Sequence, residues 1–77
     1  MQLEIDRRAN AAYVTISDAD VAETRELDPY RRLDVDGLGK VIGIEFLSIS
    51  RGVDLSELPH RPHLERLFNE HHIPIFA

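Results

Sequence analysis

The 77-residue sequence contains no cysteine, so no disulfide bond can stabilise the chain. A domain of this length buries only about 60% of the surface that its unfolded chain exposes. Domains this small are usually stabilised by disulfides, metals or partner chains. With disulfides excluded, close packing, a bound metal or association between copies remains, and we expect a homo-oligomer.

Long apolar runs are also absent. No segment approaches the roughly 20 apolar residues that span a bilayer. Leu3 and Ile5 alternate with charged residues near the start, whereas a signal peptide has a continuous apolar run. The lack of cysteine fits a reducing compartment. We therefore expect a soluble cytoplasmic protein with no membrane partner.

Positive charge is scarce, because nine Lys and Arg face fourteen Asp and Glu, for a net charge of −5. Binding to a phosphate backbone relies on clustered Lys and Arg, so this balance argues against a nucleic-acid partner. The pairs Arg7–Arg8 and Arg31–Arg32 could form a phosphate-binding patch with Lys40, but no aromatic residues are interleaved with them and nearby acidic residues would oppose it. The net negative charge suits a basic protein partner better than a nucleic acid. The plain alternative is that the charge keeps a small domain soluble.

Apolar and polar residues alternate with a period of two over the first two-thirds of the chain, which predicts β-strands. The predicted strands are 2–6, 12–17, 21–27, 32–36 and 41–47. The segment 36–39 (Asp-Gly-Leu-Gly) has the composition of a tight hairpin. The polar strand 21–27 predicts a sheet edge. Gly43 interrupts the most apolar strand, which predicts a bulge or a close approach.

The spacing becomes helical after residue 51. Leu64, Leu67 and Phe68 recur at i, i+3 and i+4, and Pro62 suits the first turn of the helix that they predict. The predicted core joins one sheet face to this helical stripe. It comprises Leu3, Ile5, Val14, Ile16, Leu33, Val35, Ile42, Ile44, Phe46, Leu64, Leu67 and Phe68.

These patterns predict a single α+β domain over residues 1–77. A small four- or five-stranded antiparallel β-meander, residues 1–50, is followed by a short C-terminal helix. That helix belongs to a helical C-terminal extension, residues 51–77, which ends in an apolar tail.

Short signatures in the first two-thirds of the chain resemble a prokaryotic family called domain of unknown function 2283. Asp6 with residues 9–14 is similar to its D-x-x-A-D-A-L-Y-I opening, although Asn10 stands where Asp is usual. Residues 21–26 match a V-A-E-T-R-E strand, and residues 34–47 resemble a D-x-D-x-x-G-x-V-V-G-I-E-I-L hairpin. The resemblance covers about residues 3–51 and implies a short antiparallel sheet. It also implies a partner-binding or antitoxin role, because some members are thought to be encoded beside small toxin-like proteins, and it carries over no catalytic residue.

Two segments are candidates for interaction. The charged strand with Glu23, Arg25 and Glu26 is either a solvated edge that resists aggregation or an edge that pairs with a partner strand. The tail is apolar, although chain ends normally fray unless something holds them. It therefore packs on its own core or on another chain. Its candidate contact residues are Ile73, Ile75 and Phe76.

Histidines and carboxylates leave an enzymatic alternative open. The imidazoles of His60, His63, His71 and His72 are possible ligands for zinc or other transition metals. No H-E-x-x-H spacing is present, so we predict no metal and no cofactor. The carboxylates that could pair for acid–base chemistry are Asp18, Asp20, Glu23, Asp34, Asp36 and Glu45. Turn chemistry accounts for several of them.

The leading hypothesis is therefore a non-enzymatic protein-interaction module with no catalytic residue, and its narrower form is an antitoxin-like neutraliser of a small basic protein. The alternative is a small metal-dependent or carboxylate-based enzyme. A third reading is an accessory domain without a ligand of its own.

Overall fold

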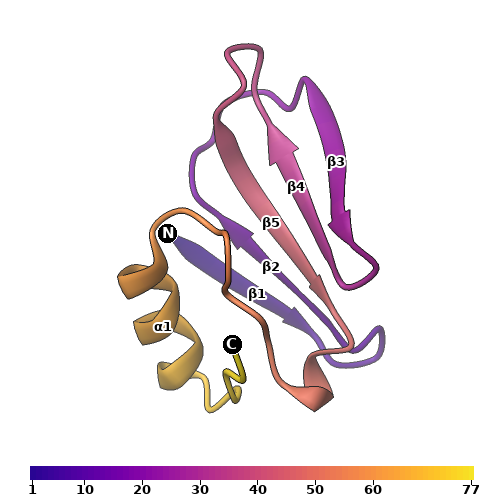
Figure 1. The fold of residues 1–77 in the computed structure, drawn as a ribbon, viewed down its shortest axis with the longest axis vertical. Coiled ribbons are helices and arrows are strands. Elements are labelled where there is room, and N and C mark those ends of the chain that lie inside the picture. The colour runs from indigo at the N-terminus through magenta and orange to yellow at the C-terminus, as the bar shows by residue number, and fades with distance from the viewer.

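The computed structural model describes all of residues 1–77. Five strands form one antiparallel sheet and a helical extension follows, which confirms the α+β class (Figure 1). The strands are β1 (Gln2–Asp6), β2 (Ala11–Thr15), β3 (Glu23–Asp28), β4 (Arg31–Val35) and β5 (Val41–Leu47). The extension contains a 3₁₀-helix, η1 (Ile49–Arg51), and an α-helix, α1 (Arg61–Glu70). No helix has both the length and the apolar composition needed to span a membrane.

The strand order is β1-β2-β5-β4-β3. The β1–β2 hairpin and the β3–β4–β5 meander are joined by a connection that crosses the upper end of β5 and β4 (Figure 1). The last strand consequently pairs with β2 and lies at the centre of the sheet. β5 is the most apolar strand, and a central position buries it best. The polar strand β3 lies at one edge, as its composition predicts.

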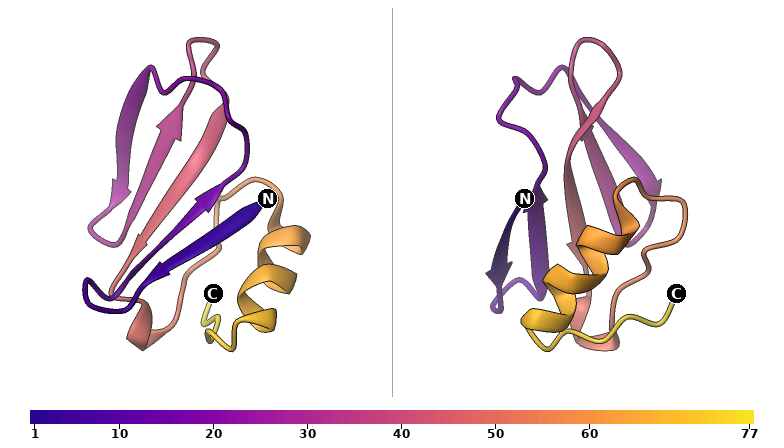
Figure 2. Two further views of the ribbon diagram at one scale, coloured as in Figure 1. Left: turned by 180° about the vertical axis from the view of Figure 1, so that it is seen from behind. Right: turned by 90° about the vertical axis from the view of Figure 1, so that its left-hand side faces the viewer.

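The extension packs against one face of the sheet, which we call the inner face. In Figures 1 and 2, α1 lies beside β1 and β2, and the segment between η1 and α1 runs over the same side of the sheet. The rings of Phe46 on β5 and Phe68 on α1 meet edge to face, with centroids 5.0 Å apart. The core cluster comprises Ala12, Val14, Ile44, Phe46, Ile49, Val53, Leu55, Leu58, Leu64, Phe68 and Ile73.

The core differs from the prediction because the extension contributes residues from the segment before α1 as well as from the helix. Val53, Leu55 and Leu58, which precede the helix and have no helical or strand periodicity, are fully or nearly fully buried. Five predicted core residues are only half-buried at the margin, namely Leu3, Ile5, Ile16, Leu33 and Leu67. The irregular segment therefore covers sheet area that a ten-residue helix leaves open.

The apolar tail packs on its own chain. Ile73 is 6% exposed and belongs to the core cluster. Ile75 forms a parallel bridge with Val53, and the Val53 N–H donates to the Pro74 carbonyl at 2.8 Å. The sequence left open whether the tail packs on its own core or on another chain, and the structure shows the tail on its own core.

Candidate functional site

The sheet face opposite the extension, which we call the outer face, is not covered by a helix. Seen from behind, only the β2–β3 connection crosses it, at its upper end (Figure 2). Directly paired residues of antiparallel strands lie on the same face, so the register identifies its members. One row across all five strands comprises Glu4, Tyr13, Glu45, Arg32 and Glu26. The adjacent row comprises Gln2, Thr15, Gly43, Asp34 and Thr24.

Tyr13 is held in one position at the centre of the outer face. Its hydroxyl donates to Asp34 Oδ2 at 2.6 Å, and the Thr24 hydroxyl donates to Asp34 Oδ1 at 2.6 Å. The phenol end lies against Gly43, where a Cβ atom would overlap the Tyr13 Oη and Cζ atoms. Of the two alternatives predicted at Gly43, a bulge or a close approach, this contact is the close approach. Side chains from β2, β3 and β4 are linked across β5 by this contact.

The surroundings of Tyr13 favour its neutral form. Burial raises the pKa of Tyr13 to about 12, and the hydrogen bond to Asp34 and the negative charges of Asp34, Glu45 and Glu4 act in the same direction. The phenol therefore remains a hydrogen-bond donor at all physiological pH values.

The outer face carries more negative than positive charge. Its two rows contain four carboxylates, on Glu4, Glu26, Asp34 and Glu45, and one guanidinium, on Arg32. Arg32 pairs with Glu45 at 3.2 Å. Glu4 and Glu26 are exposed and make no side-chain hydrogen bond or ion pair, so two free carboxylates lie near opposite edges of the sheet.

A shallow depression of about 230 Å³ lies at the β1–β2 end of the outer face. The residues that line it include the acidic Glu4, Asp6 and Glu45 and the small, apolar Ala9 and Ala11. Lys and Arg side chains combine an apolar stem with a charged end, so this combination of surfaces suits them.

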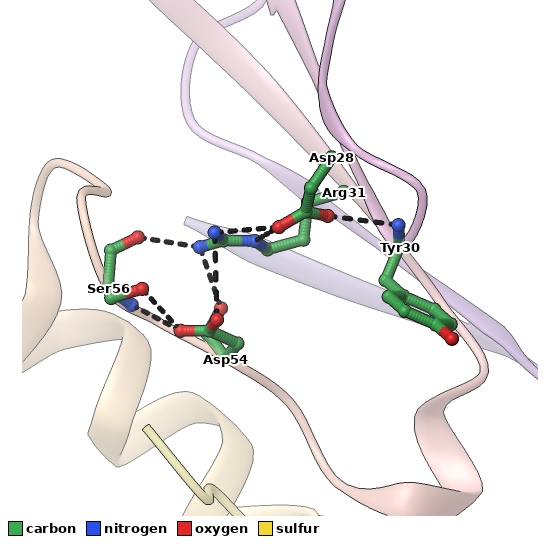
Figure 3. Close-up of polar contacts among 5 residues, drawn as sticks. All are labelled: Asp28, Tyr30, Arg31, Asp54 and Ser56. Carbon is green, nitrogen blue, oxygen red and sulfur yellow. Dashed lines mark hydrogen bonds and ion pairs between the residues drawn. The ribbon is translucent and has the colours of Figure 1, made fainter.

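Arg31 has a structural role that its interpretation as half of a basic pair with Arg32 does not predict. The Arg31 side chain is buried on the inner face, between the sheet and the extension (Figure 3). The residue is only 4% exposed. Nε donates to Asp28 Oδ2 at 3.0 Å, and Nη1 donates to the carbonyls of Asp54 and Ser56 at 3.1 and 2.6 Å. The alternation with Leu33 and Val35 could have revealed this, because it places Arg31 on the inner face.

The two carboxylates around Arg31 are stabilised in their charged forms. Partial burial alone would raise the pKa of Asp28, but hydrogen bonds from Arg31 and from the Tyr30 backbone N–H outweigh it and lower that pKa. Hydrogen bonds from the Ser56 hydroxyl and backbone N–H lower the pKa of Asp54, assisted by the positive charge of Arg31. All buried side-chain polar atoms have hydrogen-bond partners. This cluster therefore joins the β3–β4 turn to the extension, and it breaks up the basic patch considered from the sequence.

The structure separates the interaction residues predicted on β3. Glu26 lies on the outer face, whereas Glu23 and Arg25 lie on the inner-face side beyond the reach of α1 and pair with each other at 2.9 Å. In the tail, Ile73 is buried and Ile75 is half-buried, so Phe76 is the exposed member. The edge strand and Phe76 remain accessible to a partner.

The four histidines lie at opposite ends of α1. His60 and His63 are at its start, and His71 and His72 follow its end. The His71 ring donates to the Leu67 carbonyl. No group of three or more His, Cys, Asp or Glu side chains is arranged to hold a metal ion. The candidate ligands are therefore not brought together.

Comparison with known proteins gives one family. The sequence model described as "Protein of unknown function (DUF2283)" matches residues 2–50, which comprise the whole sheet and the start of η1. Neither the curated proteins nor the solved structures contain a match. Because the match covers more than half of the chain, the protein belongs to the family of proteins of unknown function DUF2283.

Proposed function

We propose that the protein is a non-enzymatic interaction module that binds a basic protein on its outer face. The observation that carries this proposal is a sheet face without a covering helix, on which four carboxylates oppose one guanidinium. Complementary charge accelerates association and selects among partners. An antitoxin-like role is the narrower form of this proposal, in which a small basic toxin is neutralised by being covered.

The rigidity of the outer face supports the proposal. Tyr13 is fixed by Asp34 and Gly43 before any partner arrives, so little side-chain freedom is lost on binding. Tyrosine is also enriched in protein interfaces. The depression beside it would take one Lys or Arg side chain of the partner, with the charged end at Glu4, Asp6 or Glu45.

The edge strand β3 would extend the same contact. Its outward backbone groups are unpaired, because β3 is the last strand of the sheet. Thr24 and Glu26 are the residues of this edge strand that lie on the outer face, and Glu26 carries the charge. A basic partner strand could therefore pair with β3 and reach the outer face at once.

A pair of charge-neutralised variants tests the proposal. Glu4→Gln with Glu26→Gln removes the two free carboxylates of the outer face, whereas Glu57→Gln with Glu70→Gln removes two exposed carboxylates of the extension. Proteins retained from an extract of the source cells are identified by mass spectrometry, and the affinity of the purified partner is then measured by calorimetry.

We expect one basic protein to bind the wild type and the extension variant equally. The outer-face variant should bind it about tenfold more weakly, and the difference should shrink at high salt. Equal affinity for the two double variants would contradict the proposal, as would a partner with net negative charge.

A further inference from the structure

A second surface feature has the opposite electrostatic character. The β1–β2 turn, η1 and the segment after α1 all lie at the lower end of the molecule (Figure 2). Residues of these three segments line a pocket of about 430 Å³. This volume is within the range of small-molecule sites, about 300–1,000 Å³. The lining residues are Arg7, Asn10, Ile49, Ser50, His72, Ile73 and Pro74.

The pocket is rich in hydrogen-bond donors and contains no acidic residue, although the chain has fourteen. Arg7 makes no side-chain hydrogen bond or ion pair, so all its guanidinium N–H groups are free. Asn10 and Ser50 hold each other in place: Asn10 Nδ2 donates to Ser50 Oγ, and the Ser50 backbone N–H donates to Asn10 Oδ1, both at 2.9 Å. The Ser50 hydroxyl hydrogen and the second Asn10 amide hydrogen remain available to a ligand.

Two of the backbone carbonyls at the pocket are already used. The Asn10 carbonyl accepts from the Ile49 N–H at 3.1 Å, and the Pro74 carbonyl accepts from the Val53 N–H at 2.8 Å. The free side-chain groups include donors on Arg7, Asn10 and Ser50, so a ligand that supplies acceptors is matched better than one that supplies donors.

His72 lines this pocket from a costly backbone conformation. It follows the end of α1 with φ 57°, in the left-handed region that glycine normally fills at this position. The His72 N–H donates to the Asn69 carbonyl and the Ile73 N–H to the Phe68 carbonyl, the two bonds of a Schellman motif. The backbone there would be more stable with glycine, and Asn10, which also lines the pocket, has a positive φ of 53° as well.

We propose that this pocket binds a small organic anion bearing a carboxylate or phosphate group. Arg7 would hold the anionic group in a bidentate contact, and Ser50 and Asn10 would donate to it. His72 would supply a further donor. The side chains of Ile49, Ile73 and Pro74 would contact an apolar part of the ligand.

This site is independent of the outer face, because it uses different residues and the opposite charge. Failure of one proposal leaves the other standing. Two matched variants separate specific binding from general attraction to positive charge. Arg7→Gln changes the pocket, whereas Arg8→Gln removes the same charge from the neighbouring exposed residue, which does not line it.

The test is a ¹⁵N-NMR titration of the full chain with three probes. Inorganic phosphate and butyrate carry the proposed anionic groups, and butylamine has a similar apolar chain with a positive charge. We expect saturable shifts at Asn10, Ser50 and His72 with phosphate, butyrate or both, and none with butylamine. Which of the two anions binds more tightly identifies phosphate or carboxylate as the preferred group.

The variants decide whether Arg7 holds the anion. Arg7→Gln should weaken binding about tenfold, and Arg8→Gln should leave it within about twofold of the wild type. Ser50→Ala should weaken it without loss of the fold, which the dispersion of the spectrum reports. Absence of saturable shifts with both anions, or equal weakening by Arg7→Gln and Arg8→Gln, would overturn the proposal.

Discussion

Tyr13 and Arg31 both connect strands through a polar side chain, but they do so on opposite faces. Tyr13 works on the outer face, where its hydroxyl reaches Asp34 over Gly43. Arg31 works on the inner face, where it ties the sheet to the backbone of Asp54 and Ser56. Each therefore holds one of the two faces in its observed shape.

Arg31→Met should lower the free energy of unfolding by about 3–5 kcal/mol, because it leaves Asp28 and Asp54 without their buried cation. The matched control is Arg32→Met, which removes an exposed partner of Glu45 and should cost less than about 1 kcal/mol. Urea denaturation measures both. Equal losses in the two variants would show that Arg31 does not join the extension to the sheet.

Tyr13 should make stability depend on alkaline pH. Its folded pKa of about 12 lies above the unfolded value of about 10. The stabilisation is therefore complete below pH 10 and is lost as the pH rises toward 12, because the unfolded chain releases the proton first. The unfolding free energy of the wild type should fall over this interval more steeply than that of Tyr13→Phe. Parallel curves for the two proteins would rule out the raised pKa.

At the scale of elements, the limits of the helix and strands follow from local pattern to within two residues. The strands 2–6 and 41–47 were predicted with the observed bounds, and β2, β3 and β4 differ by one or two residues at their ends. The α-helix begins at Arg61, next to the predicted Pro62. By contrast, η1 and the buried segment around Leu55 have no periodicity, so no pattern could reveal them.

The end of α1 offers a test of element stability. His72→Gly should raise the unfolding free energy by about 1 kcal/mol, because glycine enters the left-handed region without the Cβ penalty. His71→Gly is the control: His71 has φ −96° and its ring bonds the Leu67 carbonyl, so glycine there should destabilise the protein. Thermal denaturation compares the two. Destabilisation by His72→Gly would show that the imidazole itself stabilises the fold.

At the scale of the whole molecule, charge is distributed unevenly. The outer face is acidic, and the lower pocket carries unpaired cationic and donor groups. A third area is aromatic: the Arg51 guanidinium carbon lies 3.6 Å from the centroid of the Tyr30 ring and 4.9 Å from that of Phe76. Tyr30 and Phe76 are 42% and 53% exposed, and arginine with aromatic rings is typical of interface hot spots.

We propose that copies of the chain associate through this aromatic area, since the rest of the tail is held by its own chain. Light scattering coupled to size exclusion should report an oligomer for the wild type and a monomer for Phe76→Ser. Leu38→Ser is the control, because Leu38 is 84% exposed in the distant β4–β5 hairpin. A monomeric wild type would reject self-association, and an oligomeric Phe76→Ser would place the interface elsewhere.

Local patterns in the sequence were sufficient to predict the strand segments, the edge position of β3, the helix and a bulge or close approach at Gly43, because each depends on the period or composition of a short segment. The sequence also identified the family, through signatures confined to the sheet. Long-range packing places β5 between β2 and β4, buries Arg31, and brings the extension onto one face so that the acidic face stays open. These features depend on which distant segments bury the most apolar surface together, and no local pattern contains that information.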